Sequence, residues 1–383
     1  MFKNKDIVCI STISWDFLRQ RHQIFMQRFA EEGNRVFYIE NPHPTLRWDL
    51  GLASKVIRRL AKICPAKEKQ IPGLSVITPL VIPFKNRIAQ WLNKNIFLPC
   101  LAGYLKRKIK NPVLVWTYLA TSTVLKLIDI LKPEAVIYDC VFDARIHPDS
   151  PKDIVESDKK MIAIAKLVLT DSRFLLQRCK EINPSTRLIL PGVDFTSFAH
   201  PLCLKAKNLL HGITWPRLCF FGGIDQIRLD LELLVYLAQK KPEWNILLFG
   251  PVIKTDISCL KLKNIFLKET LPHLELPGYL AEMDVLLLPY KIIPFSKSIF
   301  PAKIFECLAS GKPIVATPLE ELNSLGNGLI QIAQTKEDFV SLIELALRLD
   351  PKTQQAKRLA AAEENSWEQR FKSLGAIITE LKL

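Results

Sequence analysis

Two residues of opposite charge, Lys303 and Glu306, stand three positions apart in the stretch SIFPAKIFECLASGKPIVAT, residues 298–317. A lysine at the start of a helix suits phosphate or pyrophosphate, because the unpaired N–H groups and the helix dipole favour an anion there. A carboxylate about one turn deeper suits two adjacent hydroxyls, such as a ribose 2′,3′-diol beside that pyrophosphate. The simpler alternative is an exposed i, i+3 ion pair worth roughly a few tenths of a kcal/mol.

The same stretch predicts the helix that would carry both side chains. Pro301 suits the first helical position, Gly311 the position just past the end, and Pro313 prevents the helix from resuming. The spacing therefore predicts a helix over residues 301–310, which follows the predicted strand 284–289. In a parallel sheet, a helix that starts after a strand begins at the sheet edge where ligands bind.

Other strand ends supply further candidate ligand contacts. Gly222 and Gly223 follow an apolar strand, where glycines let the backbone approach a ligand closely. Arg228 stands near the start of the next predicted helix and can hold phosphate oxygens bidentately. Gly250 ends another strand and can border a base. Just before residue 301, Ser296 and Ser298 supply hydroxyls and Lys297 a cation, and all three are further candidates for ligand binding.

Short apolar runs alternate with helical patterns along the whole chain. They span residues 7–12, 35–40, 74–79, 113–118, 135–140, 167–172, 187–192, 217–223, 244–250, 264–269, 284–289, 313–318 and 328–333. Continuous apolar strands alternating with helices predict parallel sheets covered on both faces. The two series are divided near residues 191–216. We therefore predict an α/β protein of two doubly wound, Rossmann-like domains facing across a cleft, over 1–195 and 205–363, with a terminal segment 364–383.

Length and composition agree with a globular protein of two domains. The chain has 383 residues, of which 49% are hydrophobic and 24% charged. Its nine cysteines are scattered without a C-x-x-C pair, which favours reduced thiols in the cytoplasm and indicates no zinc site. The N-terminus shows no signal-peptide pattern, and no window reaches eighteen apolar residues.

The formal net charge of +15 calls for an anionic partner. Basic residues alternate with Leu, Ile, Phe and Trp in residues 46–69 and 84–110, as in amphipathic segments that lie on anionic membranes. The alternative is two helices with solvated basic faces. Nucleic acid is not an expected partner, because the chain shows neither an aromatic-basic platform nor a reading helix. A peripheral position at the inner face of the cytoplasmic membrane is predicted.

Taken together, these motifs resemble the glycosyltransferases of GT-B fold, specifically the retaining group with an E-x7-E signature. The resemblance rests on LPGYLAEMDVLLLPY, SIFPAKIFECLASGKPIVAT and FFGGIDQIRLDLELL in the second half, with the hinge-like LILPGVDFTSF. NSWEQRFKSLGAII is similar to the family's terminal helix, which crosses back to the first domain. FLRQRHQIFMQRFAEEGNRVFYIE and AVIYDCVFD resemble a bacterial subgroup that acts on envelope polysaccharides and glycolipids.

The resemblance implies that the second domain binds a nucleoside-diphosphate sugar as donor substrate, without a cofactor, and that the first faces acceptor and membrane. Glu306 would then bind the ribose, Arg228 and Lys303 the pyrophosphate, and the segment starting at Leu276 the base. One departure concerns Ser298, which stands where the family has its first glutamate, a residue that contacts the donor sugar. The retaining or inverting outcome therefore stays open.

Three residues of the first half are candidates for a catalytic base. Asp139 and Asp143 stand at the end of the predicted strand 135–140, and His22 lies on the first predicted helix. Asp139 can instead cap the following turn, and His22 can be an ordinary helix-surface histidine. No D-x-D motif ends a strand, so we expect no metal ion. We expect Arg228, Lys303 and the helix dipole to stabilise the negative charge that develops on the departing diphosphate.

The sequence thus predicts a glycosyltransferase that moves a sugar from a nucleotide donor to a lipid-linked or polysaccharide acceptor in cell-envelope glycan biosynthesis. Two alternatives remain open at this point. A sugar-nucleotide epimerase can share the fold and would need further acid and base carboxylates. A non-catalytic nucleotide-sugar-binding protein would be consistent with Ser298.

Overall fold

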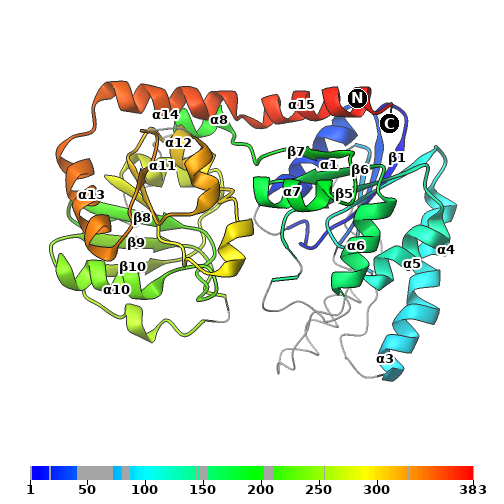
Figure 1. The fold of residues 1–383 in the computed structure, drawn as a ribbon, viewed down its shortest axis with the longest axis horizontal. Helices are drawn as coiled ribbons and strands as arrows, with labels where there is room; N and C mark the ends of the chain where they lie inside the picture. Colours follow the sequence, from blue (N-terminus) through cyan, green and yellow to red (C-terminus); the bar gives the residue numbers. More distant parts are fainter. Residues whose placement is uncertain are drawn as a thin grey trace. The chain divides into compact units, whose positions relative to one another are not determined.

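The chain folds into two compact units, each built around a parallel sheet. The computed structural model describes residues 2–16, 19–40, 72–79, 87–143, 145–146, 154–201, 210–253, 255–325 and 328–382. The first unit comprises Met1–Ile189 and Phe371–Leu383, and the second Leu190–Arg370 (Figure 1). The predicted segment 46–69 lies outside the described residues.

The first unit contains a seven-stranded sheet in the order β3-β2-β1-β4-β5-β6-β7, with every neighbouring pair parallel. Its strands are β1 (Asp6–Ile10), β2 (Arg35–Ile39), β3 (Leu74–Ile77), β4 (Val113–Thr117), β5 (Ala135–Cys140), β6 (Leu167–Thr170) and β7 (Thr186–Leu188). The strand order reverses between β1 and β4, which is where a doubly wound sheet opens a crevice at its carboxyl edge.

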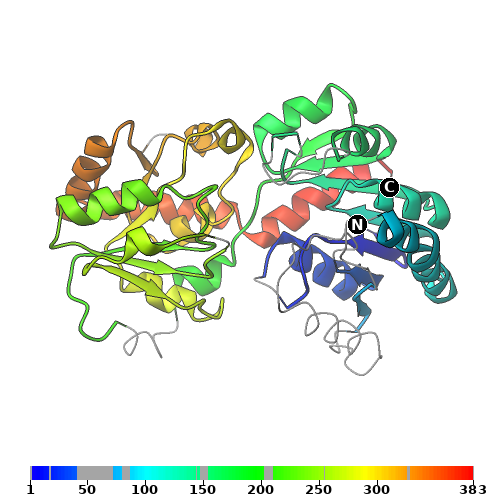
Figure 2. The same ribbon diagram turned by 90° about the horizontal axis from the view of Figure 1, so that it is seen from below.

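Helices cover both faces of this sheet (Figure 2). They are α1 (Arg21–Glu31), α3 (Arg87–Leu92), the π-helical η1 (Asn93–Phe97), α4 (Leu98–Lys108), α5 (Ser122–Leu131), α6 (Ile154–Ile164) and α7 (Arg173–Lys180). Hydroxyl caps begin two of them, since Thr121 accepts from the Val124 amide and Ser172 from the Leu175 amide. Helices on both faces explain why β1, β4, β5 and β6 are buried along their whole length.

The second unit repeats the plan with six parallel strands in the order β10-β9-β8-β11-β12-β13. These strands are β8 (Arg217–Phe221), β9 (Asn245–Phe249), β10 (Ile265–Lys268), β11 (Val285–Leu288), β12 (Ile314–Ala316) and β13 (Gln331–Ile332). Here the order reverses between β8 and β11, so the carboxyl ends of these two strands border the corresponding crevice.

Two apolar cores pack against the second sheet. The helices are α8 (Phe195–Ala199), α10 (Leu231–Lys240), α11 (Leu276–Ala281), α12 (Ile304–Ala309), α13 (Lys336–Arg348) and α14 (Lys352–Glu364), with 3₁₀ turns η2 (Ser258–Leu260), η3 (Pro294–Ser298) and η4 (Glu320–Leu325). All thirteen predicted strands are confirmed, each within a few residues, because their apolar runs are the buried centres of the two sheets.

The helix predicted over residues 301–310 is shorter than expected. It begins at Ile304 and not at Pro301, because the Ile304 amide donates to the Pro301 carbonyl at 2.9 Å, an i→i+3 bond that forms a turn. Lys303 precedes the helix with φ −74° and ψ −6°. The predicted start of the helix is therefore wrong by three residues, while the anion site at its N-terminus stays a prediction.

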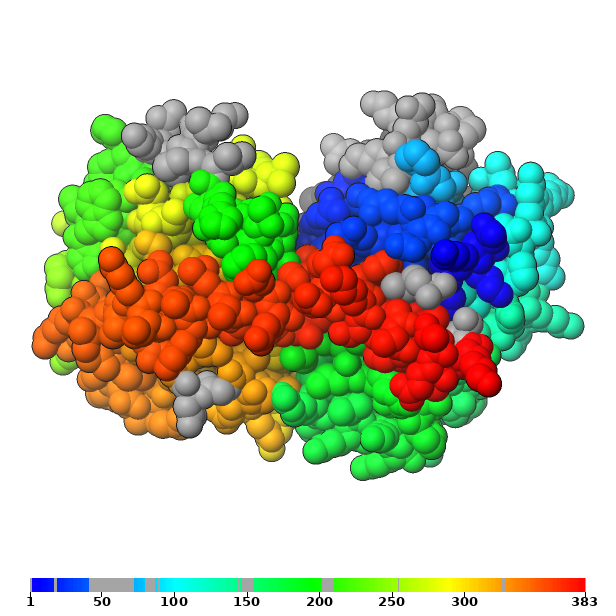
Figure 3. Space-filling model, turned by 90° about the horizontal axis from the view of Figure 1, so that it is seen from above, coloured from blue at the N-terminus to red at the C-terminus, as the bar shows by residue number. Residues whose placement is uncertain are grey.

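The last helix, α15 (Trp367–Glu380), begins in the second unit and ends in the first. In the second unit the Trp367 amide donates to the Val193 carbonyl at 3.0 Å. In the first unit Phe371 packs 5.3 Å from the ring centre of Phe29. Figure 3 shows α14 and α15 as an orange-to-red band on the surface.

Candidate functional site

Lys303 reaches from the start of α12 to the carboxyl end of β8. Its Nζ donates a hydrogen bond to the Phe221 carbonyl and lies 3.9 Å from the ring centre of Phe220. Gly222 has φ +119°, and a Cβ there would collide with the Lys303 ammonium. The first residue after β8 must therefore be a glycine for the lysine to occupy this place.

The surroundings of Lys303 lower the pKa of its amine. The pKa of the Lys303 amine is lowered from 10.5 to about 8, chiefly by burial and also by the nearby Arg228 charge, while Cys307 and Glu306 act in the opposite direction. An amine in this state is held ready for an anion, because an incoming phosphate would restore the lost stabilisation of its charge.

Two further glycines bring neighbouring loops into backbone contact. Gly250, just after β9, has φ +145°, and a Cβ there would overlap the Gly222 carbonyl. The Gly222 amide donates to the Phe249 carbonyl at 2.8 Å. Gly223 is covered by Ile253, whose Cδ1 would lie 2.9 Å from an added Cβ. The three predicted glycine positions thus gather at the carboxyl ends of β8 and β9.

Arg228 lies in the turn before α10 and not in the helix, contrary to the prediction. The buried Asp225 holds it, since Arg228 Nε and Nη2 lie 2.8 and 2.7 Å from Asp225 Oδ2. Asp225 Oδ1 also accepts from the Ile227 and Arg228 amides, an Asx turn that fixes the local backbone. Sequence reasoning missed Asp225; an aspartate shortly before a functional arginine in a loop was its only signal.

Glu306 lies in the first turn of α12 and contacts a histidine from another part of the chain. His273 Nε2 lies 3.0 Å from Glu306 Oε1, and the two side chains are 31% and 20% exposed. His273 follows β10 and precedes α11, and its ring packs edge-on to Phe198 at 5.5 Å. No spacing rule could have joined residues 33 positions apart.

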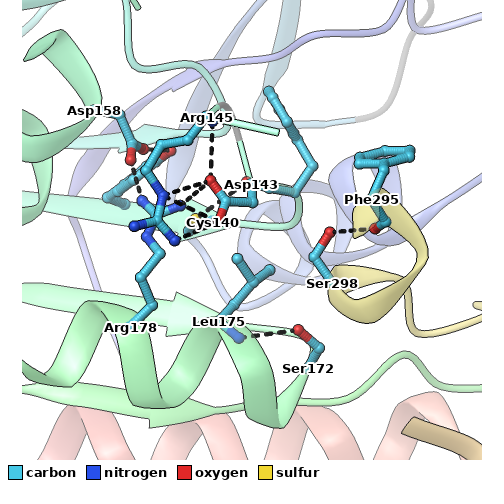
Figure 4. A network of polar contacts seen from close by, with 11 residues as sticks. Cys140, Asp143, Arg145, Asp158, Ser172, Leu175, Arg178, Phe295 and Ser298 are labelled. Carbon is cyan, nitrogen blue, oxygen red and sulfur yellow. Dashed lines mark hydrogen bonds and ion pairs between the residues drawn. The ribbon is translucent and has the colours of Figure 1, made fainter. Parts of the chain in front are cut away.

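The two serines before α12 donate their hydroxyl hydrogen bonds to backbone carbonyls of their own turn. Ser296 Oγ donates to the Ile293 carbonyl at 2.6 Å, and Ser298 Oγ to the Phe295 carbonyl at 2.9 Å (Figure 4). Both side chains are buried, whereas Lys297 is exposed. Leu276 is also buried and packs in the core, and the placement of the base near the segment that it starts stays a prediction.

In the first unit Asp139 is a buried ion-pair partner. Its carboxylate is fully buried, with Oδ2 2.8 Å from Arg21 Nε. Burial raises the pKa of Asp139, although Arg21, Tyr118 and Trp116 around the carboxylate oppose that rise. Asp139 is therefore paired and closed to solvent in this structure, and its use as a catalytic base stays a prediction.

His22 is buried and not on the helix surface. Its Nδ1 lies 2.8 Å from Ser11 Oγ, which accepts from the Tyr38 hydroxyl at 2.6 Å. The imidazole stacks on Tyr118 with ring centres 3.5 Å apart. Burial, helped by the Arg21 charge, lowers the pKa of His22 to about 3, so the ring is neutral at physiological pH and a weak base.

Asp143 belongs to a separate network of charged groups (Figure 4). Arg178 Nη1 lies 2.8 Å from Asp143 Oδ1, and Arg145 Nη2 donates to Asp143 Oδ2 at 2.7 Å. Arg178 also pairs with Asp158, which accepts from the Tyr138 hydroxyl at 2.6 Å. Burial alone would raise the pKa of Asp143, but the Arg145 hydrogen bonds and the Arg178 charge hold it below its usual range. Asp143 is thus held as a paired carboxylate, and its use as a catalytic base stays a prediction.

Comparison with known proteins places the fold. No protein-family model matches the chain. Over 138 residues the chain is 33% identical to TuaH of Bacillus subtilis strain 168, a putative teichuronic acid biosynthesis glycosyltransferase. That match covers 35% of this chain and 34% of TuaH, so the chain matches about a third of its relative's length.

Several solved structures resemble this chain over nearly its whole length, although their sequence identity to it is low. Sucrose-phosphate synthase from Thermosynechococcus elongatus gives a TM-score of 0.73 at 16% identity, over 99% of both chains. HepE from Anabaena, crystallised with UDP and glucose, gives a TM-score of 0.70 at 11% identity, over 98% of this chain and 99% of HepE. With its two parallel-sheet units, the chain has the GT-B fold.

Proposed function

We propose that this chain is a glycosyltransferase that moves a sugar from a nucleoside-diphosphate sugar to a lipid-linked or polysaccharide acceptor of the cell envelope. The observation that carries the proposal is the Lys303 amine, held beside Gly222 at the carboxyl end of β8, where the strand order reverses. The UDP and glucose bound to HepE support the donor class, and the partial match to TuaH supports the envelope acceptor.

Transfer requires stabilisation of the departing diphosphate. When the bond between the sugar C1 and the phosphate oxygen breaks, negative charge grows on the diphosphate, and Lys303 and Arg228 are the cations proposed to take it. Within the described residues, no three His, Cys, Asp or Glu side chains gather as metal ligands would. Independence of metal remains a prediction, supported by this pair of cations.

The acceptor proton also needs a destination. The acceptor oxygen forms the new bond to C1, and we infer that its proton passes to an oxygen of the departing diphosphate. The engagement of Asp139 and Asp143 with arginines and the weak basicity of His22 support this route. A proton delivered to the leaving group implies attack from the same face, and therefore retention at C1.

Binding of a sugar nucleotide is the first expected result. UDP-, GDP- and TDP-sugars are added singly to the protein, and thermal unfolding is followed. At least one should raise the Tm in proportion to its concentration, because a ligand that binds only the folded state stabilises it by mass action.

Glu306→Ala serves as the control for this experiment. The shift should be much smaller in this variant, because the ribose hydroxyls lose their acceptor. An unshifted wild type, or an equal shift in both proteins, would count against the assignment. Product analysis with a membrane extract as acceptor then separates a transferase from an epimerase, which turns over the donor alone, and from a binding protein, which turns over nothing.

The helical segments α3, η1 and α4 carry a row of exposed apolar side chains. Ile88, Trp91, Ile96 and Tyr104 are 72%, 59%, 41% and 46% exposed. Trp91 and Ile96 are five residues apart, which is the spacing of the i→i+5 hydrogen bonds in the π-helical η1 that contains Ile96. In α4, by contrast, Leu98, Ala102 and Leu105 are buried.

Cations flank this row, at Arg87, Lys94, Arg107 and Lys108. We propose that the surface docks on anionic lipid, with the aromatic rings at headgroup depth and the cations toward phosphate. The chain would then be cytoplasmic and peripheral at the inner membrane face. None of the described helices is long and apolar enough to span a bilayer.

Vesicle binding tests the membrane proposal. Reversing three charges by Arg87→Glu, Lys94→Glu and Arg107→Glu should lower affinity for anionic vesicles at least about a hundred-fold, since each cation near such a surface contributes about 1 kcal/mol. Added salt should weaken wild-type binding, which is measured by vesicle co-sedimentation.

The matched control carries the same charge change at exposed lysines of the second unit, Lys240→Glu, Lys263→Glu and Lys357→Glu. It should bind nearly as the wild type does. Equal loss in both triple variants, or equal wild-type binding to neutral vesicles, would refute a surface located on α3 and α4.

A further inference from the structure

His273 lies where it can control the carboxylate assigned to the nucleotide. It comes from the loop between β10 and α11, and its Nε2 is 3.0 Å from Glu306 Oε1 on α12. Both side chains remain partly exposed, at 31% and 20%, so the pair borders solvent and is not sealed in the core. The contact joins the loop after β10 to the helix that follows β11 in the chain.

We propose that His273 is a positioning residue for ribose recognition, holding one oxygen of Glu306 so that the other accepts the nucleotide's 2′,3′-diol. This inference rests on the proposed function. His273 would not touch the sugar being transferred; it acts through Glu306.

The chemistry of a carboxylate permits this division of labour. An ionised carboxylate has about four acceptor positions on two oxygens, so a bond to Oε1 leaves Oε2 with its own lone pairs. Without His273, the Glu306 side chain would sample several rotamers and lose that freedom on binding, at a cost of about 0.5–1.5 kcal/mol for a long side chain. The packing of Phe198 against the His273 ring in turn limits the number of rotamers open to the histidine.

A purely structural contact is the competing explanation. It would join the β10–α11 loop to α12 and stabilise the fold whether or not the ligand carries the two hydroxyls. The two explanations differ in one measurable respect: only a positioning role makes the effect of removing His273 depend on whether the ligand carries the diol.

The experiment is a cycle of protein and ligand changes measured by isothermal titration calorimetry. Wild type, His273→Ala and His273→Gln are titrated with UDP and GDP and with the 2′,3′-dideoxy form of each. His273→Ala should weaken binding of the preferred ribonucleotide about three- to ten-fold, but its dideoxy form less than about two-fold. His273→Gln, whose amide can donate to Glu306, should keep the ribonucleotide affinity within about two-fold.

A matched control is His211→Ala, an exposed histidine of the same unit, which should leave all affinities unchanged. Equal weakening of ribo- and dideoxynucleotide by His273→Ala, or no weakening, overturns the positioning role while the proposed function stands. A wild type that binds neither UDP nor GDP overturns the role of His273 toward a 2′,3′-diol. If, in addition, no UDP-, GDP- or TDP-sugar raises the Tm, the nucleotide site itself is overturned.

Discussion

Lys303→Met should lower kcat/KM by about 10²- to 10³-fold, the effect typical of removing one donor that stabilises developing charge. Methionine keeps the length and packing of the lysine stem but has no cation. The Lys303 ammonium, between the Phe221 carbonyl and the Phe220 ring, is the group best placed at the end of β8 to meet a diphosphate. Steady-state kinetics with the donor identified by thermal shift provide the measurement.

The pKa of Lys303 gives this prediction a pH signature. Because burial lowers that pKa to about 8, the charged form is present below pH 8 and is lost as the pH rises through that value. Wild-type kcat/KM should therefore fall above about pH 8. Between pH 8 and the ordinary pKa of 10.5, the Lys303 amine is protonated in the unfolded chain but not in the folded one. The free energy of unfolding therefore rises with pH over this interval.

The same argument predicts the stability of the variant. Lys303→Met removes a buried charge, so its Tm near pH 7 without nucleotide should equal or exceed that of the wild type. Gly222→Ala should lose activity by another route, since the added Cβ displaces the Lys303 ammonium. Full activity in either variant, or a Lys303→Met variant whose Tm collapses in parallel with its activity, would contradict the assigned role.

Arg178→Met should lower the free energy of unfolding by about 3–5 kcal/mol, as expected when one partner is removed from a buried ion pair. The Arg178 side chain is 8% exposed and lies between Asp143 and Asp158, which are 0% and 2% exposed. Without the guanidinium, two buried carboxylates lose a shared counter-charge. Urea unfolding gives the measurement, and such a loss is a large part of the roughly 5–15 kcal/mol typical of a domain.

Arg145→Met is the matched comparison, because Arg145 also contacts Asp143 but is 46% exposed. Its loss should cost less than about 1 kcal/mol, since solvent screens an exposed pair. Similar costs for the two arginines would show that burial does not govern this network. Asp143 pairs with both arginines, and this pairing is by itself a sufficient reason for an aspartate at this position after β5.

Sequence alone was sufficient for the architecture. A buried parallel strand must be apolar along its length, and turns must follow it, so thirteen apolar runs located thirteen strands. Gly222, Gly250, Arg228 and Lys303 could be gathered at one edge because parallel strands bring their carboxyl ends together. These inferences use local pattern and one topological rule, and neither needs a side-chain conformation.

Tertiary structure decided what each charged side chain does. The partnership of Glu306 with His273, the hold of Asp225 on Arg228, and the pairing of Asp139 with Arg21 depend on chain segments that meet only after folding. Whether a histidine such as His22 is a base depends on its burial, which a helical pattern alone does not reveal. Sequence determines which groups stand at the strand ends, but the desolvation and pairing that set their chemistry arise only from packing.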